Sequence, residues 1–197
     1  IGANAGSYTV LAGKVCGAET KSIEPCPINR RSLTENIEIN RLQDLVTIFP
    51  CALTGLNSAG VVNLTKGMGP ISRIVEDITS DTISVDALTL DEIHNRFCGK
   101  PVVVKIDTEG HEYQILLGAN DLLQTDSVAA MIIENNDPQC MQFLKESGFC
   151  GYTYDTKDKR LVLINVKNQA NIIWVRDSWL PRIQKQLARS TQLSVIM

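Results

Sequence analysis

The strongest local signal in the chain is Pro101-Val-Val-Val-Lys-Ile-Asp-Thr-Glu-Gly-His-Glu112. Its first half is apolar and β-branched apart from Lys105, which is typical of a strand buried on both faces of a parallel sheet. Its second half carries Asp107, Glu109 and His111. Ligands of open α/β sheets bind beyond the carboxyl ends of the strands, and carboxylates and imidazoles are groups that transfer protons. We therefore expect a reactive site at this strand end.

A second interpretation applies to Glu109 and Glu112. Acidic residues are favoured in the first turn of a helix because the N-terminal end of the helix dipole is positive. Apolar residues recur at helical spacing over residues 113–123, directly after this segment. On this interpretation, both carboxylates are solvated first-turn residues of the helix expected at residues 113–117.

The same residues resemble a known family. FkbM-type methyltransferases carry the signature KIDxEGxE…LxGA…LL, and this chain is similar to it in Lys105-Ile-Asp-Thr-Glu-Gly-His-Glu112, followed by Leu116, Gly118-Ala119 and Leu122-Leu123. Members of the family are O-methyltransferases that use S-adenosylmethionine (SAM). The resemblance extends over roughly the whole chain. It implies an α/β, Rossmann-like class I methyltransferase fold with a mostly parallel seven-stranded sheet, an antiparallel C-terminal hairpin and helices on both faces.

Length and composition fit one globular domain over residues 1–197, because 44% of the residues are hydrophobic and 21% are charged. The net charge of −3 gives no reason to expect a nucleic-acid partner, since such binding depends on lysine and arginine. No apolar run reaches the roughly 18 residues of a membrane span, so we expect no membrane partner and a cytoplasmic location. The six cysteines have no zinc-site spacing, and we expect reduced, mostly buried thiols in preference to three disulfides.

The chain opens with Ile1-Gly-Ala-Asn-Ala-Gly6, where the two glycines allow a sharp turn and a close approach of the backbone to a ligand. Their spacing is Gly-x-x-x-Gly and not the Gly-x-Gly-x-x-Gly of dinucleotide-binding folds. Glu24 lies 22 positions after Gly2 (24 − 2 = 22) at the end of a short predicted strand, where a carboxylate can accept hydrogen bonds from ribose hydroxyls. An ordinary turn is the alternative for the two glycines.

In the family's terms, this opening resembles the DIGANxG loop, and Ile23-Glu-Pro-Cys-Pro27 resembles the FEPxP segment. The family's Asp before Ile-Gly is absent because the sequence begins at Ile1, so we expect an N-terminally incomplete domain without most of its first strand. A further predicted strand over residues 45–49 leads to a segment that faces adenine in this fold. The cofactor-binding residues that the resemblance implies are Gly2, Ala3, Asn4, Gly6, Glu24 and Ala52.

Residues 55–81 are the least regular part of the sequence, with one short predicted strand at 61–64. Within them, Lys66-Gly-Met-Gly-Pro70 is either a substrate-facing lid or a plain surface loop. A strand from residue 82 then leads into a helix that the side chain of Thr89 is expected to cap.

The C-terminal third contains strand patterns at residues 127–133, 149–155, 160–166 and 171–175, with a turn at 157–159. Glu134 directly follows the first of these strands. Trp179, Leu180, Ile183 and Leu187 form an apolar stripe at helical spacing. This stripe packs either on the core of its own chain or on a second copy in a homodimer.

Methyl transfer to a hydroxyl requires an aligned donor and acceptor and removal of the hydroxyl proton. We assign the general base to Asp107 or His111, and Glu109 to orientation of the acceptor or the sulfonium. In an alternative, Asp107 and Glu134 hold a divalent cation through their oxygens; the primary prediction has no metal. The resemblance implies a small-molecule or glycan acceptor, namely a hydroxyl of a sugar, polyketide or related metabolite.

Two other classes of protein share parts of this pattern. A Rossmann-type oxidoreductase with a nucleotide cofactor would also have the strand, the glycine loop and the acidic residue. A non-catalytic SAM-binding or assembly domain is the second alternative, suggested by the absent upstream residues. Binding of SAM against NAD separates the first of these from a methyltransferase.

Overall fold

The computed structural model describes residues 1–55, 60–65, 74–75, 78–94, 100–134, 137–164 and 172–189. The chain forms two compact units, of which the first contains Ile1–Cys98 and Ile106–Leu122, and the second contains Gly99–Lys105 and Leu123–Met197. The loop at 66–70, interpreted above as a lid or a surface loop, lies outside the described residues, as does Cys98.

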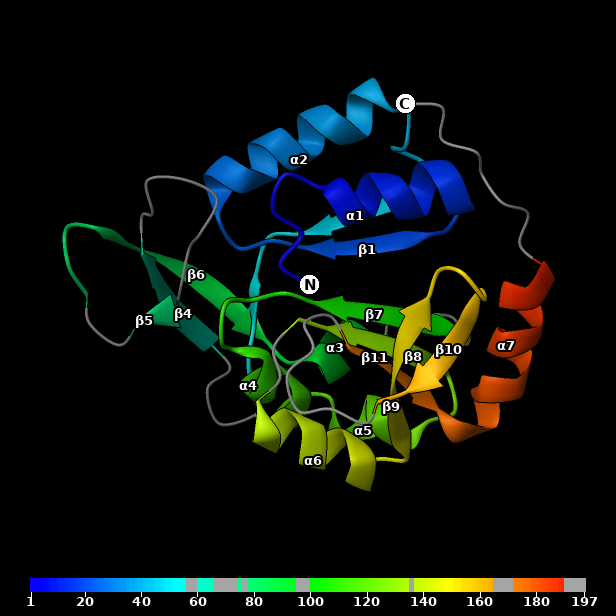
Figure 1. The fold of residues 1–197 in the computed structure, drawn as a ribbon. Helices are drawn as coiled ribbons and strands as arrows, with labels where there is room; N and C mark the ends of the chain where they lie inside the picture. The colour runs from blue at the N-terminus through cyan, green and yellow to red at the C-terminus, as the bar shows by residue number, and fades with distance from the viewer. Residues whose placement is uncertain are drawn as a thin grey trace. The chain divides into compact units, whose positions relative to one another are not determined.

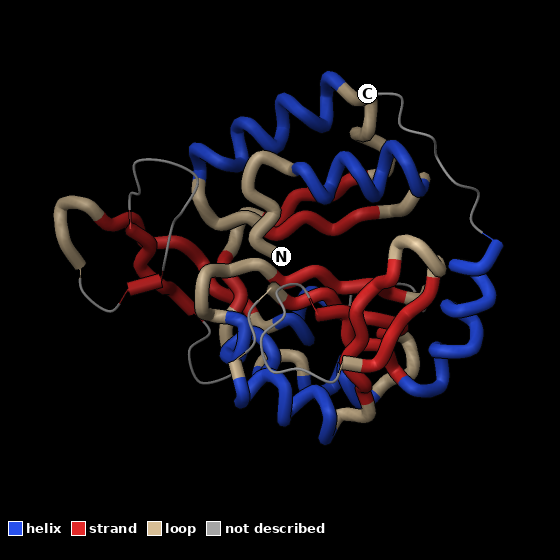
Figure 2. Tube along the Cα trace, in the orientation of Figure 1, coloured by secondary structure: helices blue, strands red, loops and turns tan. Residues whose placement is uncertain are grey.

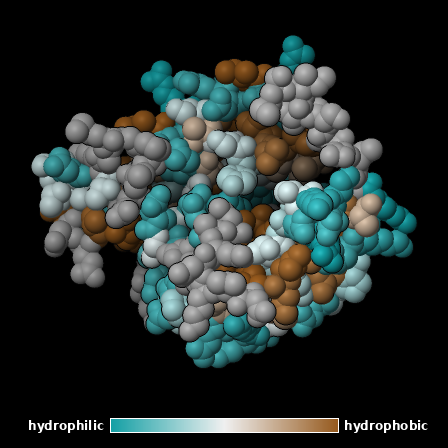
Figure 3. Space-filling model, in the orientation of Figure 1, coloured by the Kyte–Doolittle hydropathy of each residue, from teal (hydrophilic) through white to brown (hydrophobic). Residues whose placement is uncertain are grey.

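In the first unit, a parallel pair of strands is packed against helices. β1 and β2 pair along their whole length, and α1 and α2 lie on the same side of this pair (Figure 1). Leu33, Ile37 and Leu42 are buried there and pack against apolar residues of β2. The outer side of α2 is mainly hydrophilic, with apolar patches between (Figure 3). The elements are α1 (Ser7–Val10), a π-helical turn (Leu11–Val15), β1 (Thr20–Ile23), α2 (Pro27–Ile39) and β2 (Val46–Phe49).

The first unit also contains a four-stranded sheet of order β3-β6-β4-β5. β3 is parallel to β6, whereas β4 is antiparallel to both of its neighbours. Thr89 caps the helix after β6 as predicted, since its hydroxyl accepts from Glu92 N (3.2 Å) while Glu92 Oε2 accepts from Thr89 N (2.6 Å). The elements are β3 (Ala52–Leu53), β4 (Gly60–Thr65), β5 (Ile74–Val75), β6 (Thr82–Leu88), α3 (Leu90–His94) and α4 (Glu112–Leu117).

The second unit is built on a five-stranded sheet of order β10-β9-β11-β8-β7. β11 is antiparallel to both β8 and β9, and β9 forms an antiparallel hairpin with β10. Figure 2 shows this sheet in red and its two longer helices, α6 and α7, in blue. The elements are β7 (Val102–Ile106, of which Ile106 belongs to the first unit), the end of α5 (Asn120–Gln124, from Leu123 on), β8 (Val128–Ile133), α6 (Pro138–Glu146), β9 (Phe149–Asp155), β10 (Arg160–Leu163), β11 (Ile172–Arg176), a 3-10 turn (Asp177–Trp179) and α7 (Leu180–Arg189).

The structure confirms a mixed α/β fold with parallel and antiparallel strand pairs, in which the described strands form sheets of two, four and five strands. The predicted turn at 157–159 is present in the β9–β10 hairpin. The apolar stripe of α7 packs on its own unit, because Leu180, Ile183 and Leu187 contact a buried cluster that includes Tyr152 and Leu161.

The helix expected at residues 113–117 is present as α4, and the helical spacing that continues to residue 123 belongs to a second helix, α5, after a break at Gly118. A Cβ on Gly118 would lie 2.2 Å from the carbonyl oxygen of Thr54, so the backbone of another segment passes directly beside it. Asp91 then caps the second helix, since its carboxylate accepts from the backbone N–H groups of Asp121 (2.9 Å) and Leu122 (2.8 Å). These partners are distant in sequence, so apolar spacing alone did not indicate the break.

Cys16, Cys26, Cys51, Cys140 and Cys150 are free thiols, and Cys26, Cys51 and Cys140 are buried. In the part of the chain that the structure describes, no helix has the length and hydrophobicity needed to cross a membrane.

Candidate functional site

The glycine loop at residues 1–6 requires glycine at both predicted positions. Gly2 and Gly6 have positive φ angles of 69° and 97°, and Asn4 between them has a φ of 49°. A Cβ on Gly2 would lie 1.9 Å from the carbonyl oxygen of Asp107, and one on Gly6 would lie 2.6 Å from a methyl carbon of Leu33. The loop therefore contacts the backbone of Asp107 closely, and any side chain at Gly2 would prevent that contact.

Glu24 binds the backbone of the glycine loop at Asn4. Its Oε2 accepts a hydrogen bond from Asn4 N (2.8 Å), and its Oε1 accepts from Cys26 N (3.0 Å) and from the side-chain amide of Asn29 (3.3 Å). Ala3 N also donates to the carbonyl of Ile23 (3.0 Å), next to Glu24. Glu24 is 4% exposed. A carboxylate accepts about four hydrogen bonds, and these three contacts leave one acceptor position, on Oε2.

Two asparagines of α2, which the sequence interpretation missed, complete the support of the loop. Asn29 binds Glu24, and the side-chain amide of Asn36 donates to the carbonyl of Ala5 (2.8 Å). Their spacing of seven residues places them on one face of a helix. Asn29 is also buried. Two asparagines seven residues apart in the sequence were the signal that could have found them.

The turn after β7 places Asp107 against the glycine loop. Asp107 N donates to the carbonyl of Ile1 (3.3 Å). Beyond it, Glu109 and Gly110 have positive φ angles of 55° and 103°, and Glu109 is exposed. Asp107 and the glycine loop are therefore in direct contact, while Glu109 lies on the outside of the turn.

Glu112 is buried at 3% exposure, so the interpretation of this residue as a solvated helix-start carboxylate is wrong. Its Oε1 accepts from Thr108 N (3.0 Å), from the Thr108 hydroxyl (3.1 Å) and from Gly110 N (3.2 Å). Burial alone would raise the pKa of Glu112. The backbone N–H groups of Glu112, Gly110 and Thr108, together with the Thr108 hydroxyl, outweigh burial and lower this pKa below its usual value. Glu112 is thus an ionised carboxylate that closes the turn.

His111 contacts the segment after β3. Its Nε2 lies 3.2 Å from the hydroxyl oxygen of Thr54, a residue that is 1% exposed. Burial lowers the pKa of His111 below its usual value, against the opposing effect of the Glu112 carboxylate. The imidazole is therefore neutral near pH 7. Thr54 is a third residue that the sequence interpretation missed.

Ala52 lies in β3, two residues before Thr54, and it is buried at 3% exposure. Alternation along a strand places positions 52 and 54 on the same face. The structure thus joins the predicted residues in two groups within the first unit. The glycine loop contacts both Glu24 and Asp107, and His111 contacts the segment that contains Ala52.

The cation alternative involves Glu134, which is exposed and belongs to the second unit. Among the described residues, no group of three or more His, Cys, Asp or Glu side chains is arranged to hold a metal ion.

Comparison with known proteins identifies the family of the chain. The model of the methyltransferase FkbM domain matches residues 1–154. The chain therefore carries a methyltransferase domain over most of its length. It belongs to the FkbM methyltransferase family, as the signature at residues 105–123 indicated. Comparison with curated proteins gives no match.

Among solved structures, the chain is similar to the crystal structure of methyltransferase FkbM from Methylobacillus flagellatus KT. The TM-score is 0.56, the sequence identity is 18%, and the match covers 88% of this chain and 41% of that one. At this identity the likeness concerns the fold alone. The chain thus spans about two fifths of the length of the solved protein.

Proposed function

We propose that this chain is a SAM-dependent O-methyltransferase of the Rossmann-like class I type. The observation that supports this function best is the position of the loop at residues 1–6, which is bonded to Glu24 on one side and to Asp107 on the other. A glycine loop between an acidic residue and the end of a strand is the arrangement that α/β folds use for nucleoside ligands. The acceptor that we propose is a hydroxyl of a sugar, polyketide or related metabolite.

The residues of the site fit SAM by their chemistry. Ribose hydroxyls need an acceptor, and Oε2 of Glu24 has one position left. The sulfonium and the ammonium group are cations, for which Asp107 and Glu109 offer carboxylates. We propose that Gly2, Ala3, Asn4 and Gly6 contact the cofactor through their backbone and that Ala52 lies against its adenine.

Bound SAM would supply an activated methyl group. The residues of the chain then have to orient the acceptor hydroxyl and take its proton. Asp107 or His111 takes the proton in this proposal, and Glu109 orients the acceptor or the sulfonium. The lowered pKa of His111 favours a neutral ring near pH 7, and a neutral ring has one nitrogen that can accept a proton.

Calorimetric titration with SAM tests the proposal, with NAD as the competing ligand. We expect SAM to bind and NAD not to bind. The substitution Glu24→Gln should weaken SAM binding about 10-fold or more, as expected for loss of a hydrogen bond to a charged group. Glu35→Gln is the matched control, because Glu35 is an exposed residue of α2 paired with Arg31.

Binding of NAD without SAM would indicate a Rossmann-type oxidoreductase instead. Binding of SAM without methyl transfer to any hydroxyl acceptor would favour a non-catalytic SAM-binding domain. Equal SAM affinity of Glu24→Gln and Glu35→Gln would remove Glu24 from the cofactor site.

A further inference from the structure

The contact between Thr54 and His111 constrains which ring nitrogen of the histidine carries the proton. Thr54 is 1% exposed, and its hydroxyl oxygen lies 3.2 Å from Nε2 of His111. Both backbone polar groups of Thr54 are held in place by other segments. Its N–H donates to the carbonyl of Leu88 (2.9 Å), and its carbonyl packs directly against Gly118.

The hydroxyl of Thr54 has one hydrogen to donate. In the part of the chain that the structure describes, Nε2 of His111 is its hydrogen-bond partner, and no other is present. If Nε2 donated instead, the hydrogen of this buried hydroxyl would have no acceptor among the described residues, which costs roughly 1–3 kcal/mol. The hydroxyl therefore donates to Nε2, and Nε2 acts as the acceptor.

A neutral imidazole carries its proton on one nitrogen and a lone pair on the other. If Nε2 accepts from Thr54, the proton must be on Nδ1. Nδ1 of His111 bonds to no described residue, and it is not among the buried atoms. An N–H donor on this nitrogen is therefore available to a ligand, while the lone pair of the ring is already used.

We propose that Thr54 is a positioning residue that holds His111 in the tautomer protonated at Nδ1. His111 then donates a hydrogen bond to the hydroxyl oxygen of the methyl acceptor, and Asp107 is the general base. This assignment rests on the proposed function and resolves the choice it left open. The hydroxyl proton of the methyl acceptor passes to the Asp107 carboxylate while the hydroxyl oxygen forms a bond to the methyl carbon. The bond between that carbon and sulfur breaks, and sulfur keeps the electron pair.

Two-bond ¹⁵N–¹H correlation spectra of the labelled full chain near pH 7.5 test this tautomer without any substrate. The chain has two histidines, so a His94→Gln variant assigns both signals. We expect Nδ1 of His111 to show the shift of a protonated nitrogen and Nε2 that of a lone-pair nitrogen. Thr54→Ser, which keeps the hydroxyl, should leave both shifts in place.

Thr54→Val has nearly the same shape without the hydroxyl. It should change the tautomer ratio toward the form protonated at Nε2 by about fivefold, which corresponds to about 1 kcal/mol for one hydrogen bond. A protonated Nε2 in the unmodified chain would overturn the inference even if Thr54→Val does not fold. So would an unchanged ratio in a folded Thr54→Val variant.

Titration of the same labelled sample with SAM separates this inference from the proposed function. Binding of SAM together with protonation at Nε2 would contradict the inference alone. Protonation at Nδ1 without binding of SAM would leave the Thr54 contact as assigned and contradict the proposed function, and with it the role given to His111.

Discussion

Glu112 stabilises the turn after β7 through one carboxylate oxygen, and this arrangement explains why the site is formed as it is. Glu109 and Gly110 have positive φ angles, a conformation that is unfavourable for a residue with a side chain. Glu112 compensates by accepting from Thr108 and Gly110 in the same turn. The turn then presents Asp107 and His111 to different neighbours, the glycine loop and Thr54. Glu112 thus has a structural role, while its neighbours carry the proposed chemistry.

A pH dependence of stability follows from Glu112. The folded state lowers the pKa of this carboxyl below its value in the unfolded chain. Its contribution to the free energy of unfolding is therefore complete above the usual pKa of about 4.3, and it is lost as the pH falls through the lower folded-state pKa. We expect Glu112→Gln to lower the free energy of unfolding by about 1 kcal/mol at pH 7. The difference from the unmodified chain should shrink below about pH 4.3.

Urea unfolding between pH 3 and pH 7 measures this difference, with Glu35→Gln as the control for an exposed carboxylate of the same unit. A difference that stays constant over this range would show that the charge of Glu112 is not the stabilising feature.

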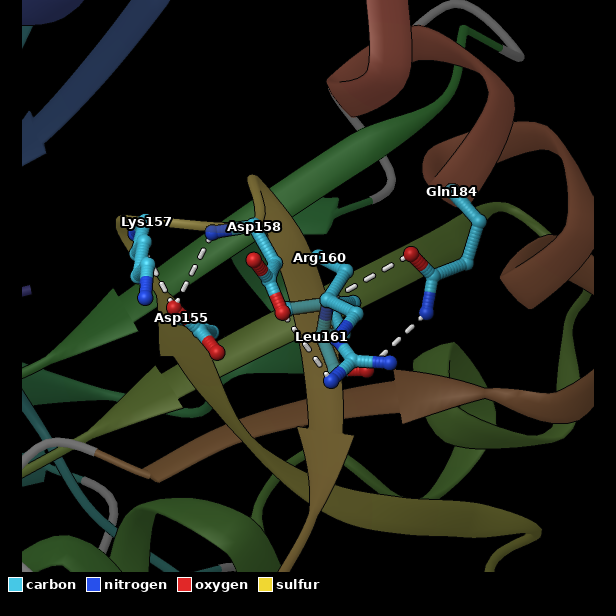
Figure 4. Close-up of polar contacts among 6 residues, drawn as sticks. All are labelled: Asp155, Lys157, Asp158, Arg160, Leu161 and Gln184. Atoms are coloured by element: carbon cyan, nitrogen blue, oxygen red, sulfur yellow. Dashed lines mark hydrogen bonds and ion pairs between the residues drawn. The ribbon is translucent and has the colours of Figure 1, made fainter.

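At the scale of elements, α7 protects the free edge of the second unit's sheet. β10 is the outermost strand of this sheet, and the backbone groups on the outer side of an edge strand can pair with another chain. Gln184 of α7 occupies such a position in Figure 4: its Oε1 accepts from Leu161 N (3.3 Å) and its Nε2 donates to Leu161 O (3.1 Å). The side-chain amide thus makes both hydrogen bonds that a neighbouring strand would make.

We expect Gln184→Ala to destabilise the second unit by about 1–2 kcal/mol, because two hydrogen bonds to one residue of an edge strand are lost. Hydrogen exchange of the Leu161 amide should become faster, since this N–H loses its partner. Gln186→Ala is the matched control, because it is the same substitution at an exposed position of the same helix. Equal exchange of the Leu161 amide in the two variants would contradict the protective role of Gln184.

The success of the sequence interpretation also differs by element. β7 follows the apolar run that begins after Pro101 and ends before Asp107, β9 covers the predicted residues 149–155, and Thr89 caps its helix, because these signals are local. The helical spacing over 113–123 is divided between α4 and α5 where Thr54 and Asp91 approach from elsewhere in the chain, and the spacing did not indicate this break. The same limit applies to the site. The glycine loop and Glu24 were predictable from spacing, whereas the roles of Asn36, Thr54 and Glu112 depend on contacts that no local pattern contains.

At the scale of the whole molecule, one arginine joins most of the elements of the second unit. Arg176, at the end of β11, donates to the carbonyls of Leu123 (2.7 Å), Val128 (3.2 Å) and Ser147 (3.3 Å). Its guanidinium also lies over the ring of Phe149, 4.3 Å from the centroid. These partners belong to α5, β8, the end of α6 and β9. Arginine can serve them together because its planar group carries five N–H donors, whereas lysine offers one compact ammonium group.

Arg176→Lys should therefore keep the charge and still lose most of these contacts. We expect the free energy of unfolding to fall by about 2–4 kcal/mol, the amount for one or two hydrogen bonds to a charged group together with carbonyls left without a donor. Arg182→Lys is the matched control, because Arg182 lies over Trp179 at 4.9 Å on the exposed side of α7 and should change stability by less than about 0.5 kcal/mol. Urea unfolding followed by tryptophan fluorescence reports on both variants, since Trp174 and Trp179 both lie in this unit. A loss in Arg176→Lys no larger than that in Arg182→Lys would mean that the three carbonyls find other donors, and that the elements of this unit are held together by their apolar contacts alone.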